Sequence, residues 1–268
     1  MKLDVYSLKG EKTGSVELPD TLLAAYRPDI IQRAVLAIQS LLRTPYGASP
    51  EAGKRHSAKL SRRRRDYRGG YGYGISRVPR KILTRRGRQM YWIAAVAPGT
   101  VGGRRAHPPK AWKNWVERIN VNEKRLALRS ALAASLDARR VAERGHRVPD
   151  AYPFAVEAAF EQLEKTKDVY AALTTLGFAD ELERASKRTI RAGRGKMRGR
   201  RYREKKSLLI IVKNAEKVKR AAENIPGVEV VPYSALNAKR LAPGAHPGRI
   251  ILLTESAVEA LKDMPWHG

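Results

Sequence analysis

The chain has 268 residues, of which 43% are hydrophobic, so it is long enough to bury a core and is not expected to be disordered throughout. It contains no cysteine, which excludes disulfides, thiol catalysis and cysteine-ligated zinc. Its 54 Lys and Arg residues against 26 Asp and Glu residues leave a formal charge of +28, and this excess indicates a polyanionic partner such as nucleic acid.

A hairpin and a helix are the first elements that the sequence predicts. Leu3, Val5 and Leu8 precede a turn region at residues 10–14, and Val16 and Leu18 follow it, which indicates two short strands. Pro28 suits the first turn of a helix. Apolar residues then recur at helical spacing until Pro45, and the predicted face consists of Ile30, Ile31, Ala34, Val35, Ile38, Leu41 and Leu42.

A second helix is predicted to begin at Asn120, because Glu123 follows three residues later and the pair resembles a capping box. Leu128, Leu132 and Leu136 then form a stripe with i, i+4 spacing that runs toward Gly145. The two predicted helices flank a long basic stretch. That stretch is therefore interpreted as an insertion within a domain.

Strand and helix patterns alternate in the C-terminal half. Strands are predicted at 151–157, 207–213, 228–231 and 249–254, and helices at 214–224, at 256–263 and around Val169, Leu173 and Leu176, the last of these closed by Gly177. This alternation favours a largely parallel sheet with flanking helices. We expect residues 1–268 to form a single α/β domain, with a long extended basic loop inserted between two helices.

The positive charge is concentrated in two segments. Residues 54–113 contain 18 basic residues and one acid, Asp66, and residues 184–206 contain 12 basic residues and one acid, Glu204. The rest of the chain carries 24 residues of each sign. Since a solvated surface spreads its charge whereas a nucleic-acid footprint concentrates it, both segments are predicted to bind RNA.

Residues 54–113 show no helical stripe, although 90–96 reads as a short strand. The string RRRRDYRGGYGYG, residues 62–74, supplies arginines for phosphates, tyrosines for unstacked bases and glycines for close backbone approach. A solvated linker or a localisation-type basic patch is the alternative, and we expect disorder in the free protein. The candidate RNA-binding residues here are Lys54, Arg55, Arg62, Arg63, Arg64, Arg65, Arg68, Arg85, Arg86, Arg88, Arg104, Arg105 and Lys110.

The second basic stretch reads RAGRGKMRGRRYREKK over residues 191–206 and could be mistaken for a phosphate loop. A Walker motif is excluded because Met197 follows Lys196 and Ile190 occupies the position of the first glycine. Alternating Gly and Arg instead form a cationic strip that can follow a phosphate backbone. Its candidate RNA-binding residues are Arg191, Arg194, Lys196, Arg198, Arg200, Arg201 and Arg203.

No residues are placed for catalysis, for a metal or for a cofactor. The histidines are His56, His107, His146, His246 and His267, and none forms an i, i+4 pair, so we expect polar or RNA-facing loop positions. The protein is therefore not expected to be an enzyme. An RNA-modifying enzyme, with the α/β domain as a cofactor-binding fold, and a free regulatory RNA binder remain the rival functions.

Membrane binding is the other role that such charge could suit. No window holds about 18 consecutive apolar residues, and none reads as a basic amphipathic helix. The N-terminal string MKLDVYSLKG lacks the apolar core of a secretory signal. We expect a cytoplasmic protein that makes no membrane contact.

Six dispersed strings carry a family resemblance along almost the whole chain: MKLDVYSLKG, YRPDIIQRAVLAIQ, RVPR, GGRRAHPPK, LALRSALAAS and GKMRGRRYR. In this order they resemble large-subunit ribosomal protein four of the archaeal and eukaryal type. The resemblance implies a structural component of the large ribosomal subunit that binds its RNA early in assembly. It implies three partners, namely large-subunit ribosomal RNA, neighbouring ribosomal proteins and the nascent peptide.

The same resemblance implies an internal loop that threads through ribosomal RNA and lines the nascent-peptide exit tunnel with its tip. It places GGRRAHPPK, residues 102–110, on the returning arm of the loop. The tip falls around residues 71–80, and its implied members are Tyr71, Tyr73, Arg77, Val78, Pro79 and Arg80.

Overall fold

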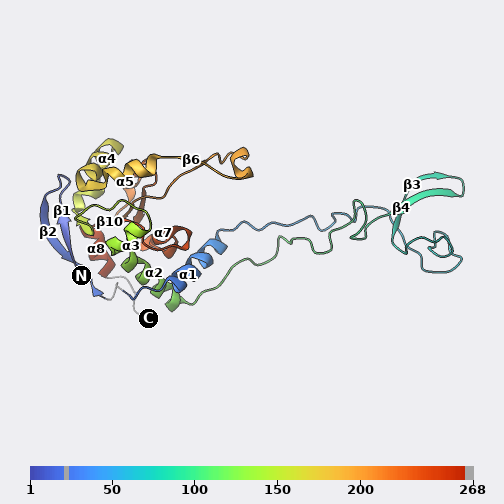
Figure 1. The fold of residues 1–268 in the computed structure, drawn as a ribbon. Coiled ribbons are helices and arrows are strands. Elements are labelled where there is room, and N and C mark those ends of the chain that lie inside the picture. The colour runs from blue at the N-terminus through green and yellow to red at the C-terminus, as the bar shows by residue number, and fades with distance from the viewer. Residues whose placement is uncertain (21–23, 263–268) are drawn as a thin grey trace. The chain divides into compact units, whose positions relative to one another are not determined.

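A computed structural model describes residues 1–20 and 24–262 (Figure 1). The chain divides into two units, one of residues 1–42 and 116–268 and one of residues 43–115, and each is described by itself. His267 and Asp263, the predicted last residue of the final helix, lie outside the described residues.

The first unit contains a central sheet with strand order β2-β1-β5-β10-β8-β9. A hairpin joins β1 to β2 in antiparallel fashion, and every other neighbouring pair is parallel, which confirms the predicted largely parallel sheet. The strands are β1 (Lys2–Tyr6), β2 (Lys12–Glu17), β5 (Phe154–Val156), β8 (Leu209–Val212), β9 (Glu229–Pro232) and β10 (Ile251–Thr254).

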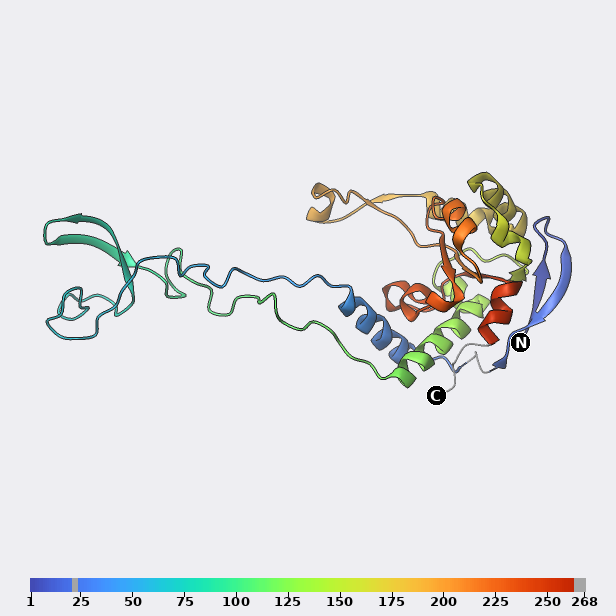
Figure 2. The same ribbon diagram turned by 180° about the vertical axis from the view of Figure 1, so that it is seen from behind.

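Both faces of the sheet are covered, as the continuous apolar run in β8 requires. Leu209 and Ile211 belong to one hydrophobic cluster, whereas Ile210 and Val212 belong to another, because successive strand side chains point to opposite faces. The first cluster includes residues from α1 (Pro28–Leu41), α2 (Val121–Leu136), α7 (Ala238–Leu241) and α8 (Glu255–Lys262). The second includes residues from α3 (Ala138–Glu143), α4 (Thr166–Leu173), α5 (Ala179–Ser186) and α6 (Glu216–Ala222). The blue β1-β2 hairpin lies at one edge of this unit in Figure 2.

Short helical turns complete this unit. They are η2 (Ala158–Gln162), η3 (Thr174–Phe178), η4 (Arg194–Met197), η5 (Tyr233–Ala235) and η6 (Pro243–Ala245). The chain was predicted to stop being helical at Gly177, which adopts a φ of +87° inside η3. Helix α5 begins two residues later and was not predicted from the sequence, and neither was the short helix α7.

Three details of the predicted helices were wrong. The predicted apolar face of α1 included Leu41 and Leu42, but the helix ends at Leu41 and these two side chains are 63% and 65% exposed. They are exposed because the last turn of α1 extends beyond the elements that pack against the helix. The Asn120 side chain makes no cap hydrogen bond, and the Glu123 carboxylate of the expected capping box pairs with Arg33 at 3.2 Å. The helix toward Gly145 breaks at Asp137, whose side chain accepts from the Arg139 amide and caps α3.

Residues 43–115 form the second unit. Its regular structure is an antiparallel hairpin of β3 (Arg80–Arg86) and β4 (Gln89–Ala94), which turns at Gly87 with a φ of +57°. The strand predicted at 90–96 is thus present. Its partner β3 was missed because its sequence, RKILTRR, is dominated by cations and shows little alternation.

Candidate nucleic-acid interface

Residues 43–115 have no hydrophobic core of their own. Gly69 and Ala95 are the buried residues of this range, and among the described residues neither hydrophobic cluster takes a member from it. Burial of apolar surface is the main term that offsets the chain entropy lost on ordering. This unit therefore depends on contacts other than a packed core for its order.

Its cations also have no acidic partners. In the part of the chain that the structure describes, no Lys or Arg of residues 43–115 forms an ion pair with Asp or Glu. The acid in their midst, Asp66, accepts hydrogen bonds from the Ser61 hydroxyl at 2.5 Å and the Tyr67 amide at 2.9 Å. The hydrogen bond from Ser61 is the largest cause that lowers the pKa of Asp66. The carboxylate is thus occupied, and the arginines keep their charge available for an external anion.

Rings and guanidinium groups lie together in this unit. The Arg77 guanidinium is 4.7 Å from the centre of the Tyr71 ring, and that of Arg80 is 5.7 Å from the Trp92 ring. Such contacts stabilise a cation by the ring quadrupole and leave its N–H groups able to donate. The implied tip residues Tyr71, Tyr73, Arg77, Val78 and Pro79 lie in the irregular stretch before β3, and Arg80 is the first residue of β3.

The outgoing and returning parts of this unit contact each other. The Ala48 amide donates to the Pro109 oxygen at 3.0 Å. A side chain at Gly53 could not be accommodated, since its Cβ would lie 2.4 Å from the Arg104 nitrogen and its φ is +75°. Residues 51 and 61 positions apart in sequence are therefore held side by side, and Arg104 of the implied returning arm belongs to this pairing.

The second basic segment forms a small hairpin on the first unit. Strands β6 (Thr189–Ile190) and β7 (Tyr202–Arg203) pair in antiparallel fashion, and η4 lies in the connection between them. The Arg191 side chain closes this connection by donating to the main-chain oxygens of Arg200 at 3.1 Å and Tyr202 at 3.4 Å. Within the described structure the remaining candidate side chains pair with no carboxylate, and all are exposed: Arg194, Lys196, Arg198, Arg200, Arg201 and Arg203.

A buried charged cluster lies at the base of this hairpin. The Glu181 carboxylate is fully buried and accepts two hydrogen bonds of 2.7 Å from the Arg184 guanidinium and one of 2.9 Å from the Ser207 hydroxyl. Burial opposes ionisation, but these donors, together with His146, lower the pKa of Glu181 to about 2. The carboxylate therefore carries a charge that fixes both ends of the segment.

His146 lies in a loop, as predicted, but it is buried and faces Glu181 instead of an RNA-binding surface. Its side chain is 4% exposed, and Nδ1 lies 2.7 Å from Oε1 of Glu181. Burial is the main cause that lowers the pKa of His146, so the ring is neutral near pH 7. It belongs to the anchoring cluster.

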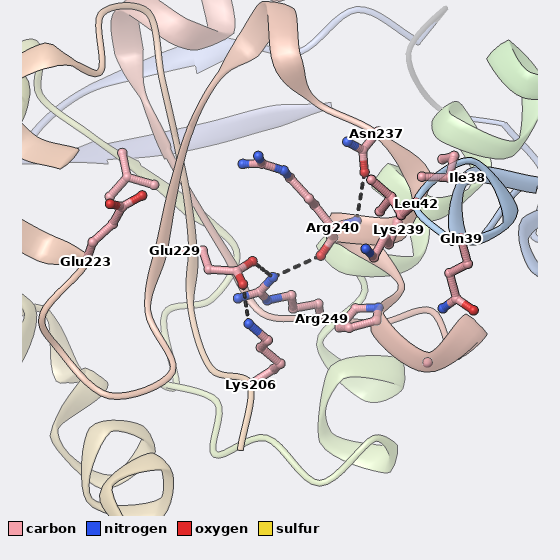
Figure 3. Close-up of a pocket in the computed structure, with 13 residues that line it drawn as sticks. Ile38, Gln39, Leu42, Lys206, Glu223, Glu229, Asn237, Lys239, Arg240 and Arg249 are labelled. Atoms are coloured by element: carbon pink, nitrogen blue, oxygen red, sulfur yellow. Dashed lines mark hydrogen bonds and ion pairs between the residues drawn. The ribbon is translucent and has the colours of Figure 1, made fainter. Parts of the chain in front are cut away.

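A second ion-pair network continues from Lys206 (Figure 3). Lys206 and the fully buried Arg249 both pair with Glu229, the latter at 2.6 Å. Arg249 also donates to the Ser207 oxygen at 2.7 Å, so it connects β10 to the start of β8. The pKa of Glu229 falls to about 2, because the cations outweigh the effect of burial.

This second network borders a pocket of about 620 Å³ whose walls include Leu42, Lys239 and Arg240 (Figure 3). The two acids that line it, Glu223 and Glu229, are both paired with cations, and among its lining residues no nucleophile is paired with a base. The described residues contain no group of three or more His, Cys, Asp or Glu side chains that could hold a metal. The anchoring residues Glu181, Glu229 and Arg249 were missed. Glu229 and Arg249 are isolated charges beside apolar strands, Glu181 is one of several charges on α5, and the sequence pattern does not identify the partner of any of them.

None of the helices that the structure describes is long and apolar enough to cross a membrane.

The sequence model of the ribosomal protein L4/L1 family matches residues 16–264. Among similar proteins, large ribosomal subunit protein uL4 of Nanoarchaeum equitans is 47% identical, with 98% of each chain covered. The uL4 protein of Archaeoglobus fulgidus is 46% identical, and the match covers 97% of this chain and 98% of the relative. The uL4 protein of Methanoculleus marisnigri is 45% identical, and the match covers 98% of this chain and 99% of the relative.

Proposed function

Because this chain belongs to the ribosomal protein L4/L1 family, we propose that it is a structural protein of the large ribosomal subunit in the cytoplasm and that it binds large-subunit ribosomal RNA. The observation that carries the proposal is the separation of charge from core. The cations of the two basic segments are exposed and largely unpaired, whereas the rest of the first unit is charge-balanced and packed around its sheet. A polyanion neutralises such segments by replacing the counterions of its phosphates.

In this function the protein positions RNA and catalyses nothing. Residues 54–113 act as an extended loop that enters ribosomal RNA, and they order during early assembly, when phosphates supply the interactions that a core does not. Residues 184–206 bind RNA next to the domain, held there by Glu181 and Arg184. Neighbouring large-subunit proteins are its other permanent partners.

Fractionation tests the proposal. The chain, expressed with an affinity tag in an archaeal host, should sediment with the large subunit and remain there after a high-salt wash. A variant in which Arg198, Arg200, Arg201 and Arg203 are replaced by Ala should compete poorly with the untagged protein for incorporation. A free regulatory RNA binder would instead be released by the wash and recovered with shorter RNAs.

We propose further that residues 71–80 line the nascent-peptide exit tunnel. Their support is the family membership, together with a position far along the sequence from both ends of the core-less unit. A photo-crosslinking amino acid at Val78 should react with stalled nascent chains. The same amino acid at Tyr170, an exposed position on α4, serves as the control and should not react. Equal crosslinking from both positions would contradict the tunnel assignment and leave the ribosomal role intact.

A further inference from the structure

The hairpin of the second basic segment exposes apolar side chains in the middle of its cations. Ile190 and Tyr202 are 62% and 47% exposed, and Met197 in the connecting turn is 76% exposed. Among the described residues none of the three belongs to a hydrophobic cluster or packs against one. Solvent exposure of three large apolar groups on one short hairpin has a free-energy cost that a partner surface would remove.

Two of these side chains form one surface. Ile190 and Tyr202 are directly opposite each other in the β6-β7 register, so they lie on the same face of the hairpin. The backbone beneath them is fixed, because the Arg191 amide donates to the Arg201 oxygen at 2.8 Å and the Arg191 guanidinium donates to the Tyr202 oxygen. The Arg201 guanidinium lies 5.6 Å from the centre of the Tyr202 ring. A flat aromatic face, a branched aliphatic edge and a guanidinium group therefore occur together.

We infer that Ile190 and Tyr202 form a stacking platform for an unpaired nucleobase of RNA, an inference that rests on the proposed function. A nucleotide joins a flat apolar face to a phosphate, and this combination matches the platform and its surrounding arginines. An apolar protein surface would cover Tyr202 but leave the neighbouring cations without counter-charge. The acid of this segment, Glu204, is paired with Arg188 at 3.2 Å and does not reduce the charge at the platform.

The platform selects a class of RNA site. A base within a regular duplex is stacked on both faces and cannot reach an aromatic side chain, whereas a bulged or looped base can. The hairpin should therefore prefer helices that carry an extruded base, with phosphates held by Arg198, Arg200 and Arg203. Stacking contributes affinity that does not depend on counterion release, so it should persist as salt is raised.

The test compares two synthetic RNA duplexes that differ only in one nucleotide: one is a perfect duplex and the other carries a single additional, bulged 2-aminopurine. Binding of the full chain to each is followed by fluorescence anisotropy at several salt concentrations. The unmodified protein should bind the bulged RNA more tightly and quench the 2-aminopurine. Tyr202→Ala should weaken binding to the bulged RNA by about fivefold to a hundredfold, remove most of the quenching and leave the salt slope unchanged. Tyr202→Phe should retain both properties, and Ile190→Ser should show a smaller loss.

Tyr170→Ala removes a tyrosine of 49% exposure from α4 and is the matched control, which should behave like the unmodified protein. Two results would overturn the platform inference and leave the proposed function standing. One is salt-dependent binding with no preference for the bulged RNA, and the other is a preference for the bulged RNA that survives in Tyr202→Ala. Absence of salt-dependent binding to either RNA overturns the proposed function itself. Unchanged RNA binding with reduced incorporation of Tyr202→Ala into subunits would assign the platform to a protein neighbour instead and contradict the inference.

Discussion

The Arg184 guanidinium donates a hydrogen bond from Nη2 to the main-chain oxygen of Lys206, 2.9 Å away. These residues are the first and last of the second basic segment, so the segment leaves and re-enters the domain at one point. Because Arg184 also pairs with the buried Glu181, that point is fixed to helix α5. The direction of the hairpin is thus set by the domain and need not be selected by RNA.

Replacement of Glu181 by Gln should strongly destabilise the domain. It removes the negative charge that Arg184 and His146 share in a buried site, and loss of one partner of a buried pair typically costs about 3–5 kcal/mol. Urea unfolding measures the change in the free energy of unfolding. Glu183→Gln, which breaks the exposed pair with Lys187 on the same helix, is the control and should have little effect. Equal small effects from both variants would show that the cluster does not anchor the segment.

Stability should fall in acid through the same cluster. Burial disfavours the charged form of Glu181, but its donors prevail and its folded-state pKa is about 2, below the ordinary value near 4.5. Its stabilising contribution is therefore fully present above about pH 5 and is lost as pH falls toward 2, amounting to roughly 3 kcal/mol. His146, whose pKa is lowered mainly by burial, acts in the same direction below its ordinary pKa. Urea midpoints measured from pH 7 to pH 3 should drop steeply, and the drop should be shallower in Glu181→Gln.

Removal of the insertion should leave the domain folded. Residues 54–109 contribute no member to either hydrophobic cluster of the described structure, so a short Gly-Ser linker in their place should preserve cooperative urea unfolding. Loop shortening alone should change the free energy of unfolding by no more than about 2 kcal/mol. Leu132→Ala in the same background tests for a native core and should cost about 2–5 kcal/mol. A shortened chain that is molten, or indifferent to Leu132→Ala, would contradict the prediction.

Salt dependence should distinguish RNA-facing cations from ion-paired ones. Replacing Arg198 and Arg200 by Ala should reduce the slope of log affinity for ribosomal RNA against log salt by about one unit per lost phosphate contact. Lys217 and Lys219 on α6 pair with Glu164 and Glu223, and their replacement removes the same charge from another surface. That control pair should leave the slope unchanged. If both pairs change the slope equally, binding reflects net charge and not this segment.

The implied loop tip should act after the first encounter with RNA. Arg77→Ala combined with Arg80→Ala should leave the affinity of the isolated protein for ribosomal RNA nearly intact, since the second segment is held at the domain. The same variant should alter chemical-probing reactivity of tunnel nucleotides in finished subunits. Arg85→Ala with Arg86→Ala, later in β3, is the matched charge control. Loss of initial binding from the tip variant, with none from the second segment, would reverse the two roles.

The sequence predicted the parts of the fold that depend on periodic patterns. The stripe around Leu132 identifies a helix because burial of one face imposes a period on the chain, and the continuous apolar run around Ile210 identifies a strand that is buried on both faces. The cluster of Glu181, Arg184 and His146 could not be predicted. His146 is 35 positions from Glu181, and Glu181 and Arg184 lie on α5, a helix whose buried face is defined only by tertiary packing. Strand β6 was missed for a similar reason, since two residues paired across a loop leave no repeat. Charge concentration located both basic segments, but it could not distinguish Arg184, which is partly buried and paired with Glu181, from Arg198, which is exposed.

The position of β1 between β2 and β5, and the packing of α1 against α2, have a consequence for the integrity of the polypeptide. Residues 1–42 contribute an interior strand and a core helix, and the Arg27 amide donates to the Ser130 hydroxyl at 2.8 Å. A single backbone cut within residues 54–109 would therefore leave two fragments that stay associated without a covalent link. The molecule could then be supplied as two separately synthesised polypeptides that complement each other, with the break placed outside the helices and strands of the first unit.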